Sequence, residues 1–280
     1  MSLFAAHAQH AKFDYYRTSI RLKSNEWDQG LAPAISDVWP STIIKDCTPA
    51  RPFERGTELL NPETRDRLLL ISRGGDHVKD VTSLQSTGKN APALAQALSA
   101  WGGAHLPSRV DSAIDWDEEG LFDSLANCAI QFAKERGIYI STPGNWPQGK
   151  ERTLYIGSRN SPLMIRLYEK GYEQQKRGDE NASLNWVRFE VEVKYPKAKQ
   201  RTELSKLTPS QCFQLGWVSD LCKRFMFDVE QIPMPSSYKT PEFDRTLRHV
   251  QKQYKALFER LDTQCESAEQ FKAILLGHVA

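Results

Sequence analysis

Long apolar runs are absent from the 280-residue sequence. The longest are fragments such as residues 68–71, whereas about 20 apolar residues are needed to cross a bilayer. The chain does not open with a basic stretch followed by an apolar core, so we expect no secretory signal. Its five cysteines are odd in number and form no CxxC pair, which argues against a disulfide framework or a zinc ribbon. The sequence therefore predicts a cytoplasmic protein of a reducing compartment, with no membrane association.

Histidine and nucleotide-binding motifs are also scarce. The six histidines form neither an HxH nor an HExxH pattern, which argues against a histidine metal site. No GxxxxGK[ST] motif occurs, so any separation of nucleic-acid strands would need a partner. The net charge of +2 is too small to indicate a nucleic-acid partner by itself. Its distribution is uneven, however, because residues 149–206 hold thirteen Lys and Arg against eight Asp and Glu.

A hydrophobic fraction of 40% and a charged fraction of 26% are typical of a globular chain. Aromatic and β-branched residues at 13–22 predict a strand. Five prolines between residues 33 and 62 exclude a long helix, so we expect a loop-rich connection at 27–61. Short strands are expected at 68–72 and 81–85, and a helix at 91–101 that ends at Gly102.

Three later segments, at 109–115, 162–170 and 186–195, alternate with a period of two residues. Each segment would have one apolar face and one charged face. If they pair in one antiparallel sheet, their charged faces share a surface that carries four carboxylates, several cations and a tyrosine. The apolar spacing at 120–136 predicts a helix that covers the other face.

The fold class that follows is α+β, with an antiparallel β-sheet core covered by helices. A further strand is expected at 153–156, and Thr208 and Pro209 predict the start of a helix that runs to about residue 227. Apolar residues spaced three or four apart at 243–261, and a capping box at 267–270, predict further helices. We expect residues 1–206 to form the α+β core and residues 207–280 a helical segment packed on or following it.

The charged surface could serve phosphoryl transfer. Carboxylates on neighbouring strands can hold Mg²⁺ or Mn²⁺, which prefer oxygen ligands, and cations beside them can bind phosphate oxygens. The cations in question are Arg159, Arg166, Lys170 and Arg188. The alternative is that these charges face water and pair across strands. The spacing alone leaves both open.

Tyr168 lies on the charged side of its segment, between Arg166 and Lys170. A phenol is a poor nucleophile at neutral pH unless neighbouring cations favour its anion, and these two cations could do so. Attack on a phosphodiester would then give a covalent phosphotyrosine. The alternative role is packing within the sheet. Tyr172 is either a second nucleophile or a surface aromatic residue.

Four segments in order resemble the replication initiation factor family, called Rep_trans. They are residues 109–115 (RVDSAID), 153–159 (TLYIGSR), 165–171 (IRLYEKG) and 186–190 (WVRFE). Residues 86–88 before a helix, and the helix expected to reach residue 261, resemble flanking features of phage-type members. The family comprises rolling-circle initiators of plasmids and filamentous phages, and relaxases of some conjugative elements.

The resemblance implies a metal-dependent endonuclease that nicks one DNA strand at an origin. The enzyme would keep the 5′ phosphate on a tyrosine and leave a free 3′ hydroxyl. It also implies a fold akin to the HUH nucleases. The histidine pair of those enzymes is missing here, so carboxylates would be the metal ligands. By motif position Tyr168 is the nucleophile, assisted by Arg166 and Lys170. The metal-ligand candidates are Asp111 and Glu190 first, then Asp115 and Glu192, which could instead pair with Arg109 or Lys194.

The resemblance also implies partners. DNA would be bound at an origin, single-stranded at the nick, and a host helicase and polymerase would act next. The candidate DNA contacts are Arg159, Arg188, Lys194, Lys197, Lys199 and Arg201, with a second basic group at Arg245, Arg248, Lys252 and Lys255. Whether the chain forms a homodimer stays open. The alternative functions are a DNA-binding protein that does not cut, and a nuclease that hydrolyses with water.

Overall fold

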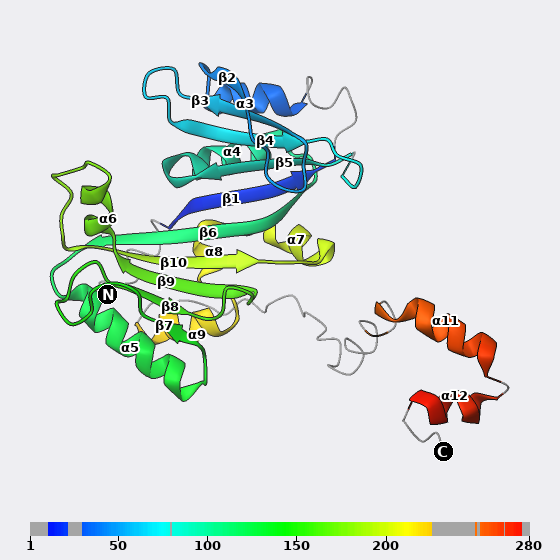
Figure 1. The fold of residues 1–280 in the computed structure, drawn as a ribbon. Coiled ribbons are helices and arrows are strands. Elements are labelled where there is room, and N and C mark those ends of the chain that lie inside the picture. Colours follow the sequence, from blue (N-terminus) through cyan, green and yellow to red (C-terminus); the bar gives the residue numbers. More distant parts are fainter. Residues whose placement is uncertain are drawn as a thin grey trace. The chain divides into compact units, whose positions relative to one another are not determined.

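A ten-stranded antiparallel sheet organises the described residues, with the strand order β2-β3-β4-β5-β1-β6-β10-β9-β8-β7 (Figure 1). The computed structural model describes residues 11–21, 30–78, 80–225, 250, 253–265 and 267–275. Its contacts divide the chain into two compact units, Met1–Met234 and Pro235–Ala280. The sheet lies wholly within the first unit.

The strands of the first half of the sheet are β1 (Lys12–Ile20), β2 (Ile43–Cys47), β3 (Arg55–Leu60), β4 (Arg67–Arg73) and β5 (Thr82–Thr87). Those of the second half are β6 (His105–Asp117), β7 (Ile140–Ser141), β8 (Thr153–Ile156), β9 (Leu163–Glu169) and β10 (Trp186–Lys194). β1 and β6 pair at the centre and join the two halves.

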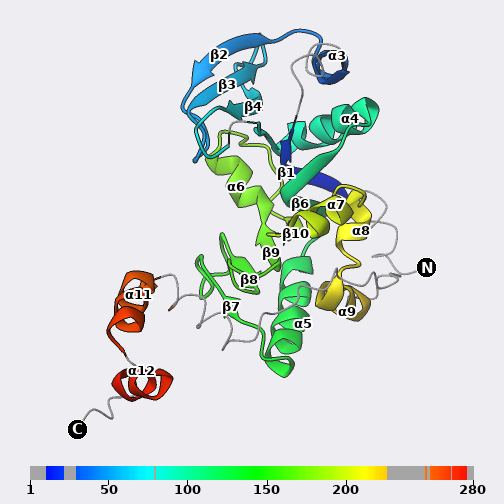
Figure 2. The same cartoon turned by 90° about the vertical axis from the view of Figure 1, so that its right-hand side faces the viewer.

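Helices cover the apolar face of this sheet. They are α3 (Ala32–Val38), α4 (Ala91–Trp101), α5 (Leu121–Glu135), α7 (Ala198–Leu204), α8 (Pro209–Cys212) and α9 (Gly216–Arg224). Their apolar residues form one core with Val110, Ile114 and Phe189 of the sheet. Figure 2 shows α4, α7, α8 and α9 on one side of the sheet and α6 (Lys170–Lys176) on the other. The charged face of the central strands is therefore covered only in part.

Most of the predicted elements are confirmed. The α+β class, the antiparallel core and the strands at 13–22, 68–72, 81–85, 109–115, 153–156 and 186–195 are present within a few residues. The helix at 91–101 is also present, and its end at Gly102 has a φ of 69°, a left-handed value that favours glycine. The helix predicted at 120–136 forms α5.

The strand predicted at 162–170 is confirmed as β9, and Lys170 is the first residue of α6. Two local predictions are wrong. Residues 27–61 are not mainly loop, because the described part holds α3, β2 and β3 between its prolines. The helix predicted from 208 to about 227 is divided into α8 and α9, which leaves Phe213 and Leu215 free to enter the core. The predicted start at Thr208 is confirmed, since its side chain and that of Gln211 form a capping box.

The second unit contains α11 (Lys255–Gln264) and α12 (Ala268–Leu275). The capping prediction at residue 267 is confirmed, because the Ser267 hydroxyl accepts a hydrogen bond from the Gln270 backbone N–H at 3.2 Å. Much of the segment 243–261, with Arg245, Arg248 and Lys252, lies outside the described residues. Among the described helices none is long and apolar enough to cross a membrane. The predicted domain boundary at residue 206 stays a prediction.

Candidate functional site

The register of the central strands brings the predicted charged residues onto one surface. On β6 and β10, Asp111 lies opposite Glu192, Ala113 opposite Glu190, and Asp115 opposite Arg188. On β9, Arg166 lies opposite Glu190, and Tyr168 lies opposite Arg188. The period-two prediction that these three strands share a charged face is therefore confirmed.

The carboxylates of this charged face are buried, whereas its cations Arg109, Arg166 and Lys194 are about one-third exposed. Asp111, Glu190 and Glu192 are 2%, 3% and 5% exposed, so each carboxylate depends on partners within the protein. The alternative in which these charges face water is therefore wrong for the carboxylates, whereas its cross-strand pairing is observed. Burial at this level is costly unless every charge is compensated.

Arg109 compensates two of these carboxylates. Its Nε donates to Asp111 Oδ1 at 2.8 Å, and its Nη2 lies 2.7 Å from Glu192 Oε2. Lys194 Nζ pairs with the other Glu192 oxygen at 2.5 Å. The expectation that Glu192 could pair with Arg109 or Lys194 is thus confirmed, and both cations do so.

Glu190 has a single cationic partner, Arg166, whose Nη2 donates to Glu190 Oε2 at 2.6 Å. Burial raises the pKa of Glu190 to about 7, with Arg166 opposing and the neighbouring Asp111 adding to the shift. Burial likewise raises the pKa of Asp111, against the influence of Arg109. Burial therefore favours the protonated form of both carboxyl groups, although each has a cationic partner.

The carboxylate oxygens of Asp111 and Glu190 are of the type that a hard divalent cation prefers, but Arg109 and Arg166 occupy them in this structure. Among the described residues no group of three or more His, Cys, Asp or Glu lies within reach of one ion. Asp115 and Glu192 are each held by two cations. The assignment of metal ligands stays a prediction.

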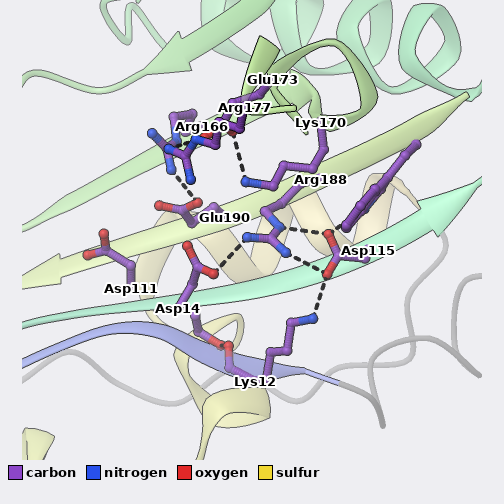
Figure 3. A network of polar contacts seen from close by, with 12 residues as sticks. Lys12, Asp14, Asp111, Asp115, Arg166, Lys170, Glu173, Arg177, Arg188 and Glu190 are labelled. Atoms are coloured by element: carbon purple, nitrogen blue, oxygen red, sulfur yellow. Dashed lines mark hydrogen bonds and ion pairs between the residues drawn. The ribbon is translucent and has the colours of Figure 1, made fainter. Parts of the chain in front are cut away.

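A second network surrounds Arg188 (Figure 3). Its guanidinium donates to Asp115 through Nε at 2.7 Å and Nη2 at 2.9 Å, and to Asp14 through Nη1 at 2.7 Å. Lys12 Nζ and the Trp186 indole N–H reach the same Asp115 carboxylate at 2.9 and 2.8 Å. Burial alone would raise the pKa of Asp115, but these donors lower it. Asp115 is therefore separate from the Asp111–Glu190 pair.

Tyr168 is 5% exposed, and its hydroxyl has no hydrogen-bond partner among the described residues. The Arg166 guanidinium lies 4.6 Å and the Lys170 ammonium 5.5 Å from the ring centroid. Burial and the Glu190 charge raise the pKa of Tyr168 more than Arg166 and Arg188 lower it. The expectation that flanking cations make this phenol acidic is therefore wrong for the protein without DNA.

Lys170 and Tyr172 lie on α6, directly after the strand that carries Tyr168. Lys170 Nζ donates to Glu173 Oε2 at 2.8 Å, and burial lowers the pKa of Lys170. Tyr172 is half-buried and lines a cavity of about 260 Å³ together with Tyr168 and Tyr155. The structure thus brings both predicted tyrosines to one cavity.

Tyr155 and Asp14 were missed by the sequence analysis. Tyr155 lies on β8 opposite Arg166, is half-buried, and lines both that cavity and a second one of about 200 Å³. The second cavity is also lined by Arg109, Arg159, Arg166, Lys194 and both glutamates of β10. The period of two within residues 153–156 could have found Tyr155. Nothing local could have found Asp14, which meets Arg188 only through the sheet.

The predicted DNA contacts are spread over the surface. Arg159 is exposed, and its backbone carbonyl accepts from Lys194 Nζ at 2.7 Å. Lys197 and Lys199 are exposed at the start of α7, and Arg201 donates to the Tyr195 carbonyl at 2.7 Å. Only Arg159 and Lys194 join the cavity beside Glu190, and Arg188 is buried in its own network.

Comparison with known proteins identifies one family. The family model described as "Rep_trans: Replication initiation factor" matches residues 108–272, more than half of the chain. A search of curated proteins finds no match. Among solved structures, a rolling circle replication initiator protein from Geobacillus stearothermophilus is similar, with a TM-score of 0.45 and 14% identity over 70% of this chain and 78% of that chain.

Proposed function

The chain belongs to the replication initiation factor family, and on this premise we propose that it starts rolling-circle replication by nicking one strand of origin DNA. One observation carries the proposal. Phenols, guanidinium groups and the carboxylates of Glu190 and Glu192, from four neighbouring strands, line adjoining cavities on one surface. Phosphodiester transfer needs this combination of nucleophile, phosphate contacts and charge stabilisation.

In the proposed reaction a tyrosine oxygen attacks the phosphorus at the nick. A bond from the tyrosine oxygen to phosphorus forms, and the bond from phosphorus to O3′ breaks. The phenol proton leaves to solvent, and the departing O3′ takes up a proton and becomes the free 3′ hydroxyl. The products are a 5′-phosphotyrosine link and a primer end for a polymerase.

Tyr168 is the nucleophile that the motif assigns, and its environment sets a condition on that role. A hydroxyl that is buried and has a raised pKa would become reactive once DNA binding opens the site and a bound divalent cation adds positive charge beside it. Tyr155 is the second candidate, because it is half-buried, lies opposite Arg166 and lines both cavities. Tyr172 lines one of the two cavities and is the third candidate.

The remaining residues would bind and orient the strand. Arg166 and Arg159 lie beside the cavity of Tyr155 and would hold phosphate oxygens, with Lys170 next to Tyr168. Mg²⁺ or Mn²⁺ held by Asp111 and Glu190, with Asp115 and Glu192 as further candidates, would polarise the phosphodiester when bound. Lys197, Lys199 and Arg201 would contact flanking DNA, while a host helicase and polymerase extend the product.

The test is a denaturing gel of the protein mixed with Mg²⁺ or Mn²⁺ and labelled single-stranded oligonucleotides tiled across a candidate origin. We expect a shifted band that survives denaturant and needs the divalent ion. Tyr168→Phe, Tyr155→Phe and Tyr172→Phe are compared in parallel, since each removes one hydroxyl. The variant that alone loses the band identifies the nucleophile.

Two outcomes contradict the proposal. Cutting without a retained 5′ end in the wild-type protein would indicate hydrolysis by water. Salt-dependent binding of a specific duplex with no adduct, on oligonucleotides or on supercoiled DNA, would favour a DNA-binding protein that does not cut.

A further inference from the structure

A larger cavity lies on the same side of the sheet, beyond the Arg188 network. Its volume is about 710 Å³, against about 200 Å³ for the cavity beside Glu190. Its walls come from the start of β1 and of β4, the turn after β5, α6, and the start of β10. Two carboxylates, Asp14 and Asp66, line it, against six cations: Lys12, Arg67, Lys89, Lys170, Arg177 and Arg188.

Several of these cations are available to a ligand. The side chains of Arg67, Lys89 and Arg177 are 46%, 74% and 68% exposed. Lys89 lies 3.2 Å from the exposed Asp66, whereas Arg67 lies 3.9 Å from Glu58, which is 15% exposed. An exposed pair such as Lys89–Asp66 contributes about 0–1 kcal/mol, so Lys89 yields readily to a phosphate. The cavity therefore favours a polyanion.

Trp186 adds an aromatic surface to this wall. Its indole N–H donates to Asp115 Oδ1 at 2.8 Å, which fixes the ring, and the Arg188 guanidinium lies 5.9 Å from the ring centroid. Grooves that bind single-stranded nucleic acid combine cations along the backbone with aromatic rings on which bases stack. A duplex offers its phosphates but not its base faces, so the ring favours a single strand.

The cavity adjoins the proposed reaction site. Arg188 lies opposite Tyr168 in the sheet register, and the Lys170 ammonium is 5.5 Å from the Tyr168 ring centroid. The opposite wall, with Arg67 and the turn at residues 88–90, lies outside the segment 108–272 that the family model matches. The family assignment therefore does not account for this wall.

We propose that this cavity, named here the 67/89 cleft after Arg67 and Lys89, binds the single DNA strand that enters or leaves the reaction site. The N-terminal half of the sheet thus supplies part of the substrate groove. The inference rests on the proposed function, because it takes DNA as the substrate.

The test measures binding of a fluorescein-labelled oligothymidylate of about 12 nucleotides by anisotropy at several salt concentrations. The variant is Arg67→Ala/Lys89→Ala, and the matched control is Lys134→Ala/Lys206→Ala, which removes the same charge from exposed positions outside the cleft. Each lost phosphate contact lowers the slope of log K against log salt by about 0.7 for a single strand. We expect the slope to fall by about 1.4 and the affinity by about 25-fold at 0.1 M salt. The control should keep the wild-type slope.

A second variant tests the aromatic contact. Trp186→Leu should weaken binding of the oligonucleotide with an unchanged salt slope, because stacking releases no counterions. Wild-type binding by the double variant, or an equal loss in the control, would overturn the cleft. An equal loss of single-stranded and duplex binding would overturn its preference for a single strand.

The adduct assay separates this inference from the proposed function. If the cleft binds the substrate strand, Arg67→Ala/Lys89→Ala needs more oligonucleotide for half-maximal adduct. If the wild-type protein binds the strand through the cleft and forms no adduct, the cleft stands and the nicking proposal fails. If adduct forms equally well in both proteins at every oligonucleotide concentration, the cleft fails and the nicking proposal stands.

Discussion

Tyr168 combines burial with an unsatisfied hydroxyl, and both features bear on its role. A buried polar group without a partner costs about 1–3 kcal/mol of stability. The protein retains such a group beside Glu190, Arg166 and Arg188. The Glu190 charge raises the pKa of the Tyr168 phenol, and the two arginines lower it. A residue that acts on a bound substrate can carry this cost in the free protein.

Removing that hydroxyl should therefore stabilise the fold. For Tyr168→Phe we expect the free energy of unfolding in urea to rise by about 1 kcal/mol, because an unsatisfied group is lost without a change in packing. The control is Tyr16→Phe, since the buried Tyr16 hydroxyl lies 3.1 Å from His105 Nε2 and loses a real hydrogen bond. That variant should lose about 1 kcal/mol. Destabilisation by both variants would show that the Tyr168 hydroxyl has a partner in solution.

His105, the partner of Tyr16, should make stability depend on pH. Burial lowers the pKa of His105 below its usual 6.5, although the Gly103 carbonyl opposes the shift. The unfolded chain then binds a proton more readily than the folded one, so stability is lost as the pH falls through about 6.5. We expect the urea midpoint to fall more between pH 7.5 and 5.5 in the wild type than in His105→Gln. Glu190 has a raised pKa, so its protonation stabilises the folded state as the pH falls, in both proteins. The informative quantity is therefore the difference between the two falls in urea midpoint. An equal fall in the two proteins would contradict the prediction.

At the scale of the elements, the Arg152 side chain links β8 to β9 and α5. Arg152, just before β8, donates to Glu169 Oε1 at 2.9 Å and to Asp123 Oδ1 at 2.6 Å, and its guanidinium lies 4.4 Å from the Phe122 ring centroid. Its backbone N–H donates to the other Glu169 oxygen at 2.7 Å. The end of the Tyr168 strand is thereby tied to the helix behind the sheet.

Loss of this cation should leave a buried charge unpaired. The Arg152 and Glu169 side chains are 11% and 8% exposed, so Arg152→Met should cost about 3 kcal/mol of unfolding free energy. In a Glu169→Gln background the same change should cost about half as much, because the only carboxylate then left without Arg152 is the exposed one of Asp123. Urea unfolding of the four proteins gives the coupling energy. A coupling near zero would show that Arg152 acts through Asp123 and Phe122 rather than through Glu169.

The elements that the sequence predicted are those whose side chains alternate in environment. Residues 109–115 and 186–195 have a regular period of two because one face packs on helices and the other carries charge. β2 and β3 were missed because prolines at 49 and 52 hid two short strands of the sheet's outer half. The division of the helix after Thr208 was missed because only the packed core shows that Phe213 and Leu215 point inward.

The residues of the charged site could be predicted within each strand, but their pairing across strands could not. Asp111, Glu190 and Arg166 are found by their alternation, whereas the choice of partners depends on register. Asp14 meets Arg188 across 174 residues of sequence, and Arg109 serves both Asp111 and Glu192. Burial of this face depends on the whole sheet and cannot be seen in one strand. The expected lowering of the Tyr168 pKa by its flanking cations was therefore wrong, because burial raises it.

On the scale of the whole molecule, the extent of the folding unit is open to a direct test. The predicted boundary falls at residue 206, yet α8 and α9 place Cys212, Phe213, Leu215, Val218 and Leu221 in the core at 0–1% exposure. The Ser112 hydroxyl on β6 also donates to the Pro209 carbonyl at 2.8 Å. The contact division after Met234 keeps these helices with the sheet.

Truncation at the two boundaries should therefore give different results. A chain ending at Lys206 exposes the apolar face over β6 and β10. Loss of five buried side chains worth about 1.5–3 kcal/mol each is comparable to the whole stability of a typical domain. We expect it to lack cooperative thermal unfolding by circular dichroism. A chain ending at Met234 should unfold in one transition within a few degrees of the full-length midpoint. Cooperative unfolding of the shorter chain would instead make residues 1–206 an independent core, with α8 and α9 as a dispensable cover.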